Sequence, residues 1–512
     1  MADKSEERSA GPVELRQFTI DPASVQLLKH AYCLQNRLVI LGSVDPKAGT
    51  AVTVGFVEPG DAALVAEVAA VLDRPVCAVQ LNAFEIRKAL EAGFLLPPSG
   101  REPARLTLKP PKELSFDPNT PAATILSEVL ARGVQIGASD IHFESYEDDI
   151  DVRVRVDGIL HHVNTALSRE NIAAVVSRLK IIAGLDIAER RVAQDGRVNA
   201  VLEEGEKKRN IDFRVSVVPG PFGEDAVLRI LDSAKPLLGL VDLGFAREEL
   251  ARLESLISNP EGMLLVTGPT GSGKTTTLYA AINQINTINN KILTVEDPIE
   301  YLFPKVNQKQ VSGQMGFAAY ARSFMRQNPD IILIGEIRDE ETAQAALRAA
   351  QTGHLVLSTL HTGDAVRTVS RLRTLGLESG LVASTLLGAL SQRLLRRLCP
   401  ACRREAPASP AERRRLRLEE GERDFFTAVG CAECGGDGYK GRIGVYELFV
   451  LDEELAELVA DEAPVHRIRR RALEAGMRSL LEDALDKARA GSTTLAEILR
   501  VVPYRIIAAD RG

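Results

Sequence analysis

The stretch that decides the fold is "GPTGSGKTTT", residues 268–277. It matches the pattern G-x-x-x-x-G-K-[ST] at Gly268, Gly273, Lys274 and Thr275. The apolar run "GMLLVTG" leads into it and the helical pattern "TLYAAINQIN" follows it, which is the strand-to-helix context that a phosphate-binding loop requires. A chance glycine-rich turn is the alternative, and this context argues against it.

The chemistry of such a loop follows from its residue types. Glycines let backbone N–H groups converge on phosphate, the helix start adds positive potential, Lys274 neutralises terminal phosphates and Thr275 ligates Mg²⁺. The sequence therefore predicts that ATP and Mg²⁺ bind here. The residues expected at the nucleotide are Gly268, Pro269, Thr270, Gly271, Ser272, Gly273, Lys274, Thr275 and Thr276.

Two apolar stretches downstream end in carboxylates. "PDIILIGEIRD" ends in Glu336, and "ILTVEDPIEY" ends in Glu296, Asp297 and Glu300. Carboxyl ends of parallel strands meet at the ligand-binding edge of a sheet, and hydrolysis needs carboxylates that hold the metal and orient water. Glu336 is therefore predicted to be functional, against the alternative of an ordinary surface carboxylate. Among the other three, some are expected only to cap or to form ion pairs.

A third apolar strand, "GHLVLSTLHT", carries a histidine near each end, His354 and His361. In a nucleotide-binding fold, such residues sense the state of the phosphates or have a purely structural role. The sequence leaves both possibilities open.

The rest of the chain divides by composition and periodicity. Its 512 residues are 45% hydrophobic and 26% charged, which is typical of a globular, multidomain protein. A small α/β unit is expected in residues 1–95, a proline-rich linker in 96–120, an α+β unit with arginines alternating along its strands in 121–235, and a parallel α/β unit in 240–395. A cysteine module follows in 396–445 and a helical region in 446–512.

The charge balance limits the choice of partners. The net charge of −7 argues against a nucleic-acid surface spread over the whole molecule, and zero Trp with 4% aromatic residues leaves little for base stacking. A nucleic-acid-handling module that uses the run "AERRRLRLEE" remains an alternative. Neither a signal peptide nor a long apolar segment is seen, so we expect a cytosolic chain.

Four cysteines form two close pairs, Cys399 with Cys402 in "CPAC" and Cys431 with Cys434 in "CAEC". Two C-x-x-C knuckles supply four thiolates to one tetrahedral Zn²⁺, and with no open position the ion is expected to be structural. Cys33 and Cys77 are predicted to be buried small hydrophobes.

Taken in order, "GPTGSGKTTT", "ILTVEDPIEY", "PDIILIGEIRD" and "TGHLVLSTLHT" resemble the Walker A, Asp box, Walker B and His box of the secretion ATPase superfamily. The upstream "SDIHFE", "RVRVDGIL", "GLDIAERRVAQDGR" and "DFRVSVV", with the paired cysteines, narrow the resemblance to the type II secretion and type IV pilus assembly ATPases. It extends from about residue 120 to about residue 450.

The resemblance implies a multidomain α/β and α+β chain: a RecA-like P-loop ATPase core, preceded by a PAS-like domain and a small α/β adaptor domain, with a tetracysteine zinc module. It implies that Glu300 and Glu336 serve metal and water, with Glu296 also at the nucleotide and His361 catalytic. Arg197 and Arg214 of the PAS-like domain are the first candidates to approach the phosphates, and a solvated face is the alternative. The second group of candidates is Arg153, Arg155 and Arg229.

The function implied is that of a hexameric motor. ATP hydrolysis would power type II secretion by assembling a pseudopilus, with type IV pilus assembly, DNA uptake and an ATP-binding scaffold without turnover as alternatives. The implied partners are five further copies of the chain and an inner-membrane platform protein that docks on the adaptor domain. The chain would then be cytoplasmic and peripheral to the inner membrane, with no nucleic acid bound. Some relatives bind a cyclic dinucleotide in the adaptor, but residues 20–95 lack a matching recognition repeat.

Overall fold

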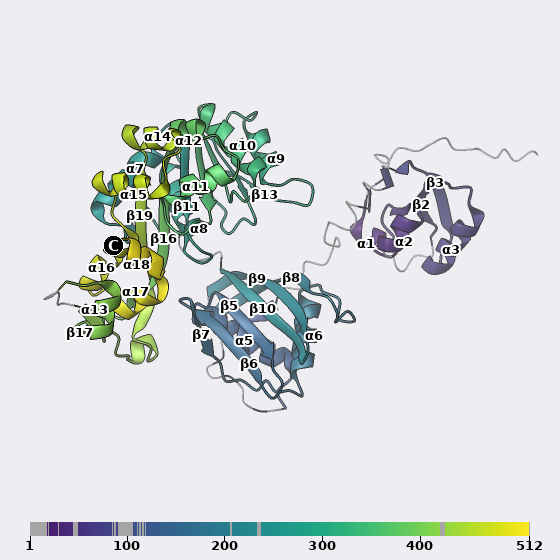
Figure 1. The fold of residues 1–512 in the computed structure, drawn as a ribbon. Helices are drawn as coiled ribbons and strands as arrows, with labels where there is room; N and C mark the ends of the chain where they lie inside the picture. Colours follow the sequence, from purple (N-terminus) through teal and green to yellow (C-terminus); the bar gives the residue numbers. More distant parts are fainter. Residues whose placement is uncertain are drawn as a thin grey trace, which may run out of the picture.

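The structure is a computed structural model, and Figure 1 shows that it contains folded units with separate sheets. It describes residues 18, 20–28, 30–44, 50–83, 85–86, 89–90, 106–109, 111, 114, 117, 119–204, 207–232, 237–419 and 425–510. Within these residues, no helix is both long enough and apolar enough to cross a bilayer.

The amino-terminal unit is a small α/β fold whose sheet has the order β1-β2-β3. Its elements are β1 (Leu38–Leu41), β2 (Val52–Phe56), β3 (Val76–Gln80), α1 (Pro22–Val25), α2 (His30–Gln35) and α3 (Ala62–Leu72). Cys33 is buried in its core, as predicted. The prediction for Cys77 is wrong, because this residue is exposed. It lies on the edge strand β3, where alternate side chains point away from the core.

The second unit is a seven-stranded sheet with α5 and α6 packed on one face (Figure 1). Its elements are β4 (Leu106–Leu108), α5 (Ala122–Gln135), β5 (Asp140–Ser145), β6 (Ile150–Val156), β7 (Ile159–His162), α6 (Ile172–Ile182), β8 (Gln194–Glu204), β9 (Lys207–Gly220) and β10 (Gly223–Asp232). The strand order is β4-β8-β9-β10-β5-β6-β7. β4 falls inside the predicted linker and joins the sheet beside β8, where Leu108 is fully buried.

The face of this sheet opposite the helices carries a row of charged side chains that lie directly opposite one another across four strand pairs. The pairs are Arg197 with Arg214, Arg214 with Arg229, Arg229 with Asp140, and Asp140 with Arg155. We call these five residues the arginine row. Asp140 lies between Arg229 and Arg155 and offsets their charge. The pairs Arg197 with Arg214 and Arg214 with Arg229, in contrast, bring like charges together, which is destabilising unless an anion lies nearby.

The third unit contains the phosphate loop in a sheet of order β13-β12-β14-β15-β11-β16-β19, parallel except for β19. The strands are β11 (Gly262–Thr267), β12 (Ile292–Glu296), β13 (Asn307–Gln310), β14 (Ile331–Ile334), β15 (Leu355–Leu360), β16 (Leu386–Leu398) and β19 (Tyr439–Val450). Its helices are α7 (Arg247–Ile257), α8 (Lys274–Ile285), α9 (Phe317–Phe324), α10 (Glu340–Gln351), α11 (Arg367–Thr374) and α12 (Ser379–Thr385). Two hydrophobic clusters cover the two faces, one including α9 and α10 and the other α7 and α8.

The cysteine module lies between the paired strands β16 and β19, and helices follow it to the carboxyl end (Figure 1). The module contains β17 (Arg404–Ala406), α13 (Pro410–Leu416) and β18 (Phe425–Thr427). The helices that follow are α14 (Glu453–Ala460), α15 (Val465–Glu474), α16 (Leu480–Arg489), α17 (Leu495–Val501) and α18 (Tyr504–Asp510).

Candidate active site

The phosphate loop connects the fully buried strand β11 to the start of α8 at Lys274. Gly268 has φ of 151°, and a Cβ there would lie 2.6 Å from the Gln392 carbonyl oxygen, so a larger residue does not fit. Lys274 Nζ donates to the carbonyls of Gly268 at 2.9 Å and Pro269 at 3.2 Å. Burial lowers the pKa of Lys274, and the charge of Glu336 opposes this shift.

Gln392 on β16 holds the loop from behind, a role that the sequence motifs did not indicate. Its side-chain amide donates to the Ser272 carbonyl at 2.7 Å and accepts from the Thr277 hydroxyl at 2.8 Å. Gln392 is itself buried, so both bonds are shielded from water. The loop is therefore fixed to the strand that leads into the cysteine module.

Glu336 and His361 meet at the carboxyl edge of the sheet. Glu336 Oε1 lies 3.0 Å from His361 Nε2, and Glu336 Oε2 accepts from Arg338 Nε at 2.8 Å. Both Glu336 and His361 line the cavity beside the phosphate loop. His354 lies at the other end of β15, where its Nδ1 is 2.8 Å from the Ala349 carbonyl oxygen.

The two Asp-box glutamates have different surroundings. Glu296 is buried at the end of β12 and is hydrogen-bonded to three neighbouring side chains, those of Tyr279, Thr294 and Gln308. Glu300 is exposed at the cavity wall. Desolvation of its carboxyl, together with the nearby charge of Glu296, raises the pKa of Glu300.

The cavity beside the phosphate loop measures about 780 Å³, and both the second and the third unit contribute to its walls. Residues 270–276, Glu296, Glu300, Glu336 and His361 line it from the third unit. The second unit contributes Ser139, Asp140, Arg155, Gly158 and Arg229. Gly268 and Pro269 are not among the lining residues of the described chain and contribute the carbonyls that hold Lys274.

The arginine row continues from this cavity into a hollow of about 450 Å³ that Asp140 and Arg229 also line. Arg197 and Arg214, the two arginines placed first in the sequence prediction, lie in that second hollow. Burial lowers the pKa of Arg214, as does the charge of Arg197. The buried Arg214 Nε has no hydrogen-bond partner among the described residues. A guanidinium in this state is favourable next to an incoming anion.

Arg153 lies on β6, two residues before Arg155, but is paired outside the arginine row. Its Nε donates to Glu144 Oε2 at 2.7 Å, and its Nη2 bonds the Tyr146 hydroxyl at 3.1 Å. Arg153, Arg155 and Arg229 were the second group of candidates in the sequence prediction. Of these three, Arg155 and Arg229 line the cavity.

A contact beside the cavity joins the second unit to the cysteine hairpin, by which we mean the paired strands β16 and β19 with the cysteine module between them. Asp157 Oδ2 accepts from the Gly441 backbone at 2.8 Å, and Asp157 Oδ1 lies 3.2 Å from Arg442 Nε. His161 Nε2 lies 3.6 Å from Asp437 Oδ2 nearby. Arg442 itself lines the cavity, so the hairpin brings a further cation to the site.

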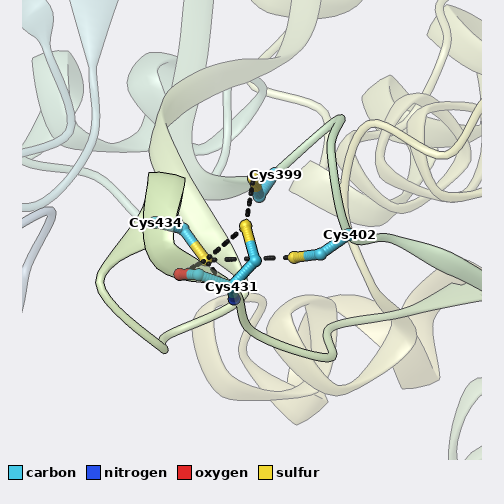
Figure 2. Close-up of side chains that lie close together, drawn as sticks. All are labelled: Cys399, Cys402, Cys431 and Cys434. Atoms are coloured by element: carbon cyan, nitrogen blue, oxygen red, sulfur yellow. Dashed lines mark hydrogen bonds between the residues drawn. The ribbon is translucent and has the colours of Figure 1, made fainter.

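The four cysteines of the module converge on one point (Figure 2). Their sulfurs all lie within 4.8 Å of one another, with separations of 3.9, 3.9 and 3.8 Å for three of the pairs. A tetrahedral zinc with bonds of about 2.3 Å places its sulfur ligands about 3.8 Å apart. The donor set and its geometry therefore fit Zn²⁺.

Backbone donors already favour the thiolate in this cluster. Cys434 Sγ accepts from the backbone N–H of Cys431 at 3.2 Å and of Gly438 at 3.1 Å. Desolvation acts to raise the pKa of Cys434, but these donors and the neighbouring thiols outweigh it and lower the pKa to about 6. Metal ligation requires thiolates, and the backbone donors at Cys434 stabilise that form.

Comparison with known proteins identifies the family of this chain. The family model described as "Type II/IV secretion system protein" matches residues 117–500. The chain belongs to this family. A second family model, the MshEN domain, matches residues 9–95 of this secretion family member.

Relatives in the family are similar over most of their length. The type II secretion system protein HxcR of Pseudomonas aeruginosa is 49% identical over 76% of this chain and 79% of its own. The type IV pilus assembly ATPase PilB of Myxococcus xanthus is 45% identical over 74% and 68%, and the type II secretion system ATPase E of Vibrio cholerae is 44% identical over 76% of both. This secretion family member is an ATP hydrolase.

Solved structures agree on the fold. The ATPase DotB of Legionella pneumophila superposes with a TM-score of 0.57 at 22% identity, over 78% of this chain and 99% of that protein. DotB of Yersinia pseudotuberculosis gives a TM-score of 0.56 at 21% identity, over 80% of this chain and 100% of that protein. The mixed α/β ATPase fold predicted from the phosphate loop is thereby confirmed.

Proposed function

We propose that this ATPase is a homohexameric motor that assembles the pseudopilus of a type II secretion system. The proposal rests on the family and on the arginine row, of which Asp140, Arg155 and Arg229 line the same cavity as the phosphate loop. If the second unit, which we take to be the PAS-like domain, closes over bound nucleotide, its arginines meet the charge that develops on the transferred phosphate. Hydrolysis then lets the second unit open again, so that the chemical step produces a movement of the domains.

Each residue at the cavity receives a role in this proposal. Residues 268–276 bind the phosphates, with Lys274 on the terminal ones and Thr275 on Mg²⁺. Glu336 orients the attacking water and His361 holds Glu336, since the two side chains are already in contact. Glu300 serves the metal from the opposite wall.

The arginine row supplies the remaining cations. Arg155 and Arg229 are nearest the phosphate loop, and Arg214 and Arg197 extend the row into the adjoining hollow. Among the described residues, Arg214 Nε has no hydrogen-bond partner. We infer that a bound anion would stabilise Arg214 more than any other member of the row. In a ring, the outer part of the row would face the neighbouring copy.

Zinc has a structural role in this proposal. Cys399, Cys402, Cys431 and Cys434 would hold one Zn²⁺ with no open coordination position, which stabilises the hairpin that carries Arg442. Through Asp157, the same hairpin contacts the second unit.

We propose that the amino-terminal unit is the adaptor that docks on an inner-membrane platform protein, which would place the chain in the cytoplasm at that membrane. The match of residues 9–95 to an MshEN domain supports a separate module with its own partner. Pilus assembly is the second candidate, because the relative from Myxococcus xanthus is a pilus assembly ATPase of similar identity.

The test uses the full chain in a host that lacks its own copy. Wild type is expected to restore secretion of an exoprotein, and Lys274→Ala is not. Restoration of surface pili without secretion would instead assign the chain to pilus assembly. Native mass spectrometry with ATP and Mg²⁺ should show six copies, and a chain that stays monomeric under these conditions would contradict the ring. Salt-sensitive retention on single-stranded DNA would favour the nucleic-acid alternative.

A further inference from the structure

Tyr279 belongs to the phosphate-loop helix and is buried beneath the cavity. It lies on α8, with 4% of its surface exposed, and its ring meets Phe303 edge to face with centroids 5.0 Å apart. In the sequence, Tyr279 occupies one more apolar position of an amphipathic helix. Its position beside the cavity nevertheless brings its hydroxyl to the Asp box.

The Tyr279 hydroxyl uses both of its hydrogen-bonding capacities on that box. It donates to Glu296 Oε2 and accepts from the backbone N–H of Glu300 at 3.1 Å. One oxygen atom therefore connects the side chain of one glutamate to the main chain of the other. Because α8 begins at Lys274, the phosphate loop and the Asp box share this connection.

Glu296 is held too firmly to act as a free carboxylate. Besides Tyr279, its Oε1 accepts from Thr294 Oγ1 at 2.5 Å and from Gln308 Nε2 at 3.1 Å. Its residue is 4% exposed, so a charge at this place depends on these donors. Reaching toward a nucleotide-bound metal would break these hydrogen bonds.

Glu300 has the opposite character. It is exposed at the cavity wall, and the nearby Glu296 helps to raise its pKa while Arg214 and Arg229 lower it. The hydrogen bond from the Glu300 backbone N–H to the Tyr279 hydroxyl fixes the backbone position from which the Glu300 side chain extends. A small displacement there changes the position of a carboxylate on the wall of the cavity that the phosphate loop also lines.

We propose that Tyr279 is a positioning residue for ATP hydrolysis: it anchors Glu296 as a structural carboxylate and thereby presents Glu300 to the metal-bound nucleotide. The inference rests on the proposed role of Glu300. It assigns Glu296, which the motif alone places at the nucleotide, to the support of the site.

The test is Tyr279→Phe in the full chain, which keeps the ring and removes only the hydroxyl. We expect kcat to fall about tenfold, because a misplaced carboxylate slows the chemical step, while KM and the affinity for a fluorescent ATP analogue stay within about twofold. Wild-type kcat would overturn the proposal. So would a loss of nucleotide affinity by the same factor as kcat, since that result indicates damage to the loop itself.

Tyr301→Phe is the matched control. Its ring packs against the same Phe303, with centroids 5.2 Å apart, and this variant is expected to keep wild-type kcat. A loss equal to that of Tyr279→Phe would show that either hydroxyl merely supports the aromatic cluster, which would also overturn the proposal.

A double-mutant cycle tests the shared anchor. Glu296→Gln should lower kcat without raising the Mg²⁺ concentration needed for half-maximal turnover, and Tyr279→Phe/Glu296→Gln should be no slower than the slower single variant. A raised Mg²⁺ requirement in Glu296→Gln would show a metal ligand and overturn the inference. Full turnover in Glu300→Gln would instead refute the proposed role of Glu300, a result distinct from those above.

Discussion

His361 Nε2 lies 3.0 Å from Glu336 Oε1, although the two residues follow different strands, β15 and β14. The strands are parallel neighbours, with Ile334 opposite Ser358, so their carboxyl ends deliver both side chains to one place. The Glu336 carboxylate is thus bounded by His361 on one oxygen and Arg338 on the other. These contacts fix its orientation toward the phosphate loop.

Glu336→Gln is expected to lower kcat at least about 100-fold, because the amide keeps the shape of the side chain but neither orients water as a base nor carries charge. ATP binding is expected to stay near wild type. Phosphate release and binding of a fluorescent ATP analogue measure the two properties separately.

Two further variants serve as comparisons for Glu336→Gln. Lys274→Ala should lose nucleotide affinity as well as turnover, since in the proposed role Lys274 neutralises the terminal phosphates. Glu341→Gln changes an exposed carboxylate on α10 and should leave both properties unchanged. Turnover in Glu336→Gln close to that of Glu341→Gln would exclude Glu336 from the chemistry.

Arg214→Gln is expected to move the acid limb of the pH profile of kcat to higher pH. In its proposed role, Glu300 must be ionised to hold a cation, so turnover is expected to fall as the pH drops through its pKa. Arg214 lowers that pKa, and removing its charge lets the pKa rise further above the ordinary value. Measurement of kcat at saturating ATP between about pH 5 and pH 8 checks the direction.

Arg209→Gln is the control for that profile. Arg209 lies on the same strand, β9, but its Nη2 is 3.1 Å from Asp232 Oδ2, and this pair is not part of the cavity wall of the described chain. An acid limb that moves equally in both variants would mean that the shift reflects net charge and not Arg214.

Cys431→Ser is expected to reduce bound zinc from about one ion per chain and to lower the melting temperature, because three ligands hold the ion less well than four. Metal analysis of the purified chain and thermal unfolding measure these effects. Cys77→Ser replaces an exposed cysteine of the amino-terminal unit and should change neither. Full zinc content in Cys431→Ser would contradict the assigned ligand set.

Glu249→Gln is expected to stabilise the protein above neutral pH. Burial, together with the charge of Asp483, raises the pKa of Glu249 to about 7, and neither carboxylate oxygen has a hydrogen-bond partner among the described residues. An acid with a raised folded pKa favours the folded state when protonated. The free energy of unfolding of the wild type should therefore fall by about 3 kcal/mol as the pH rises from about 4.3 to about 7.

The comparison is made at two pH values. The gain in melting temperature of Glu249→Gln over wild type should be larger at about pH 8 than at about pH 5. Glu248→Gln, an exposed neighbour on α7, should show no such difference. Equal gains at both pH values would mean that Glu249 does not titrate in the folded protein.

The parts of the site that the sequence predicted are those encoded locally. The phosphate loop, the carboxylates after β12 and β14 and the two cysteine pairs are each contained in a few consecutive residues, so no knowledge of long-range pairing is needed. The fold class followed from the alternation of apolar strands and helices around the loop.

What the sequence did not predict depends on register and on contacts between units. The arginine row exists only because the register of the sheet aligns arginines of β8, β9, β10 and β6 with Asp140 of β5. Arg229 and Arg155 line the cavity where Arg197 and Arg214 were expected first. Arg442 comes to the cavity on a hairpin far along the chain. β4 is three residues long, too short for periodicity to separate it from a linker.

The bonds from Asp157 to Gly441 and Arg442 have a practical consequence. They join a tight turn of one unit to an exposed stretch of another, so labels can be attached on both units close to this junction. Energy transfer between two dyes across this junction would therefore rise and fall as the units engage and separate. Such a signal would follow each opening and closing of a single chain in real time during ATP turnover.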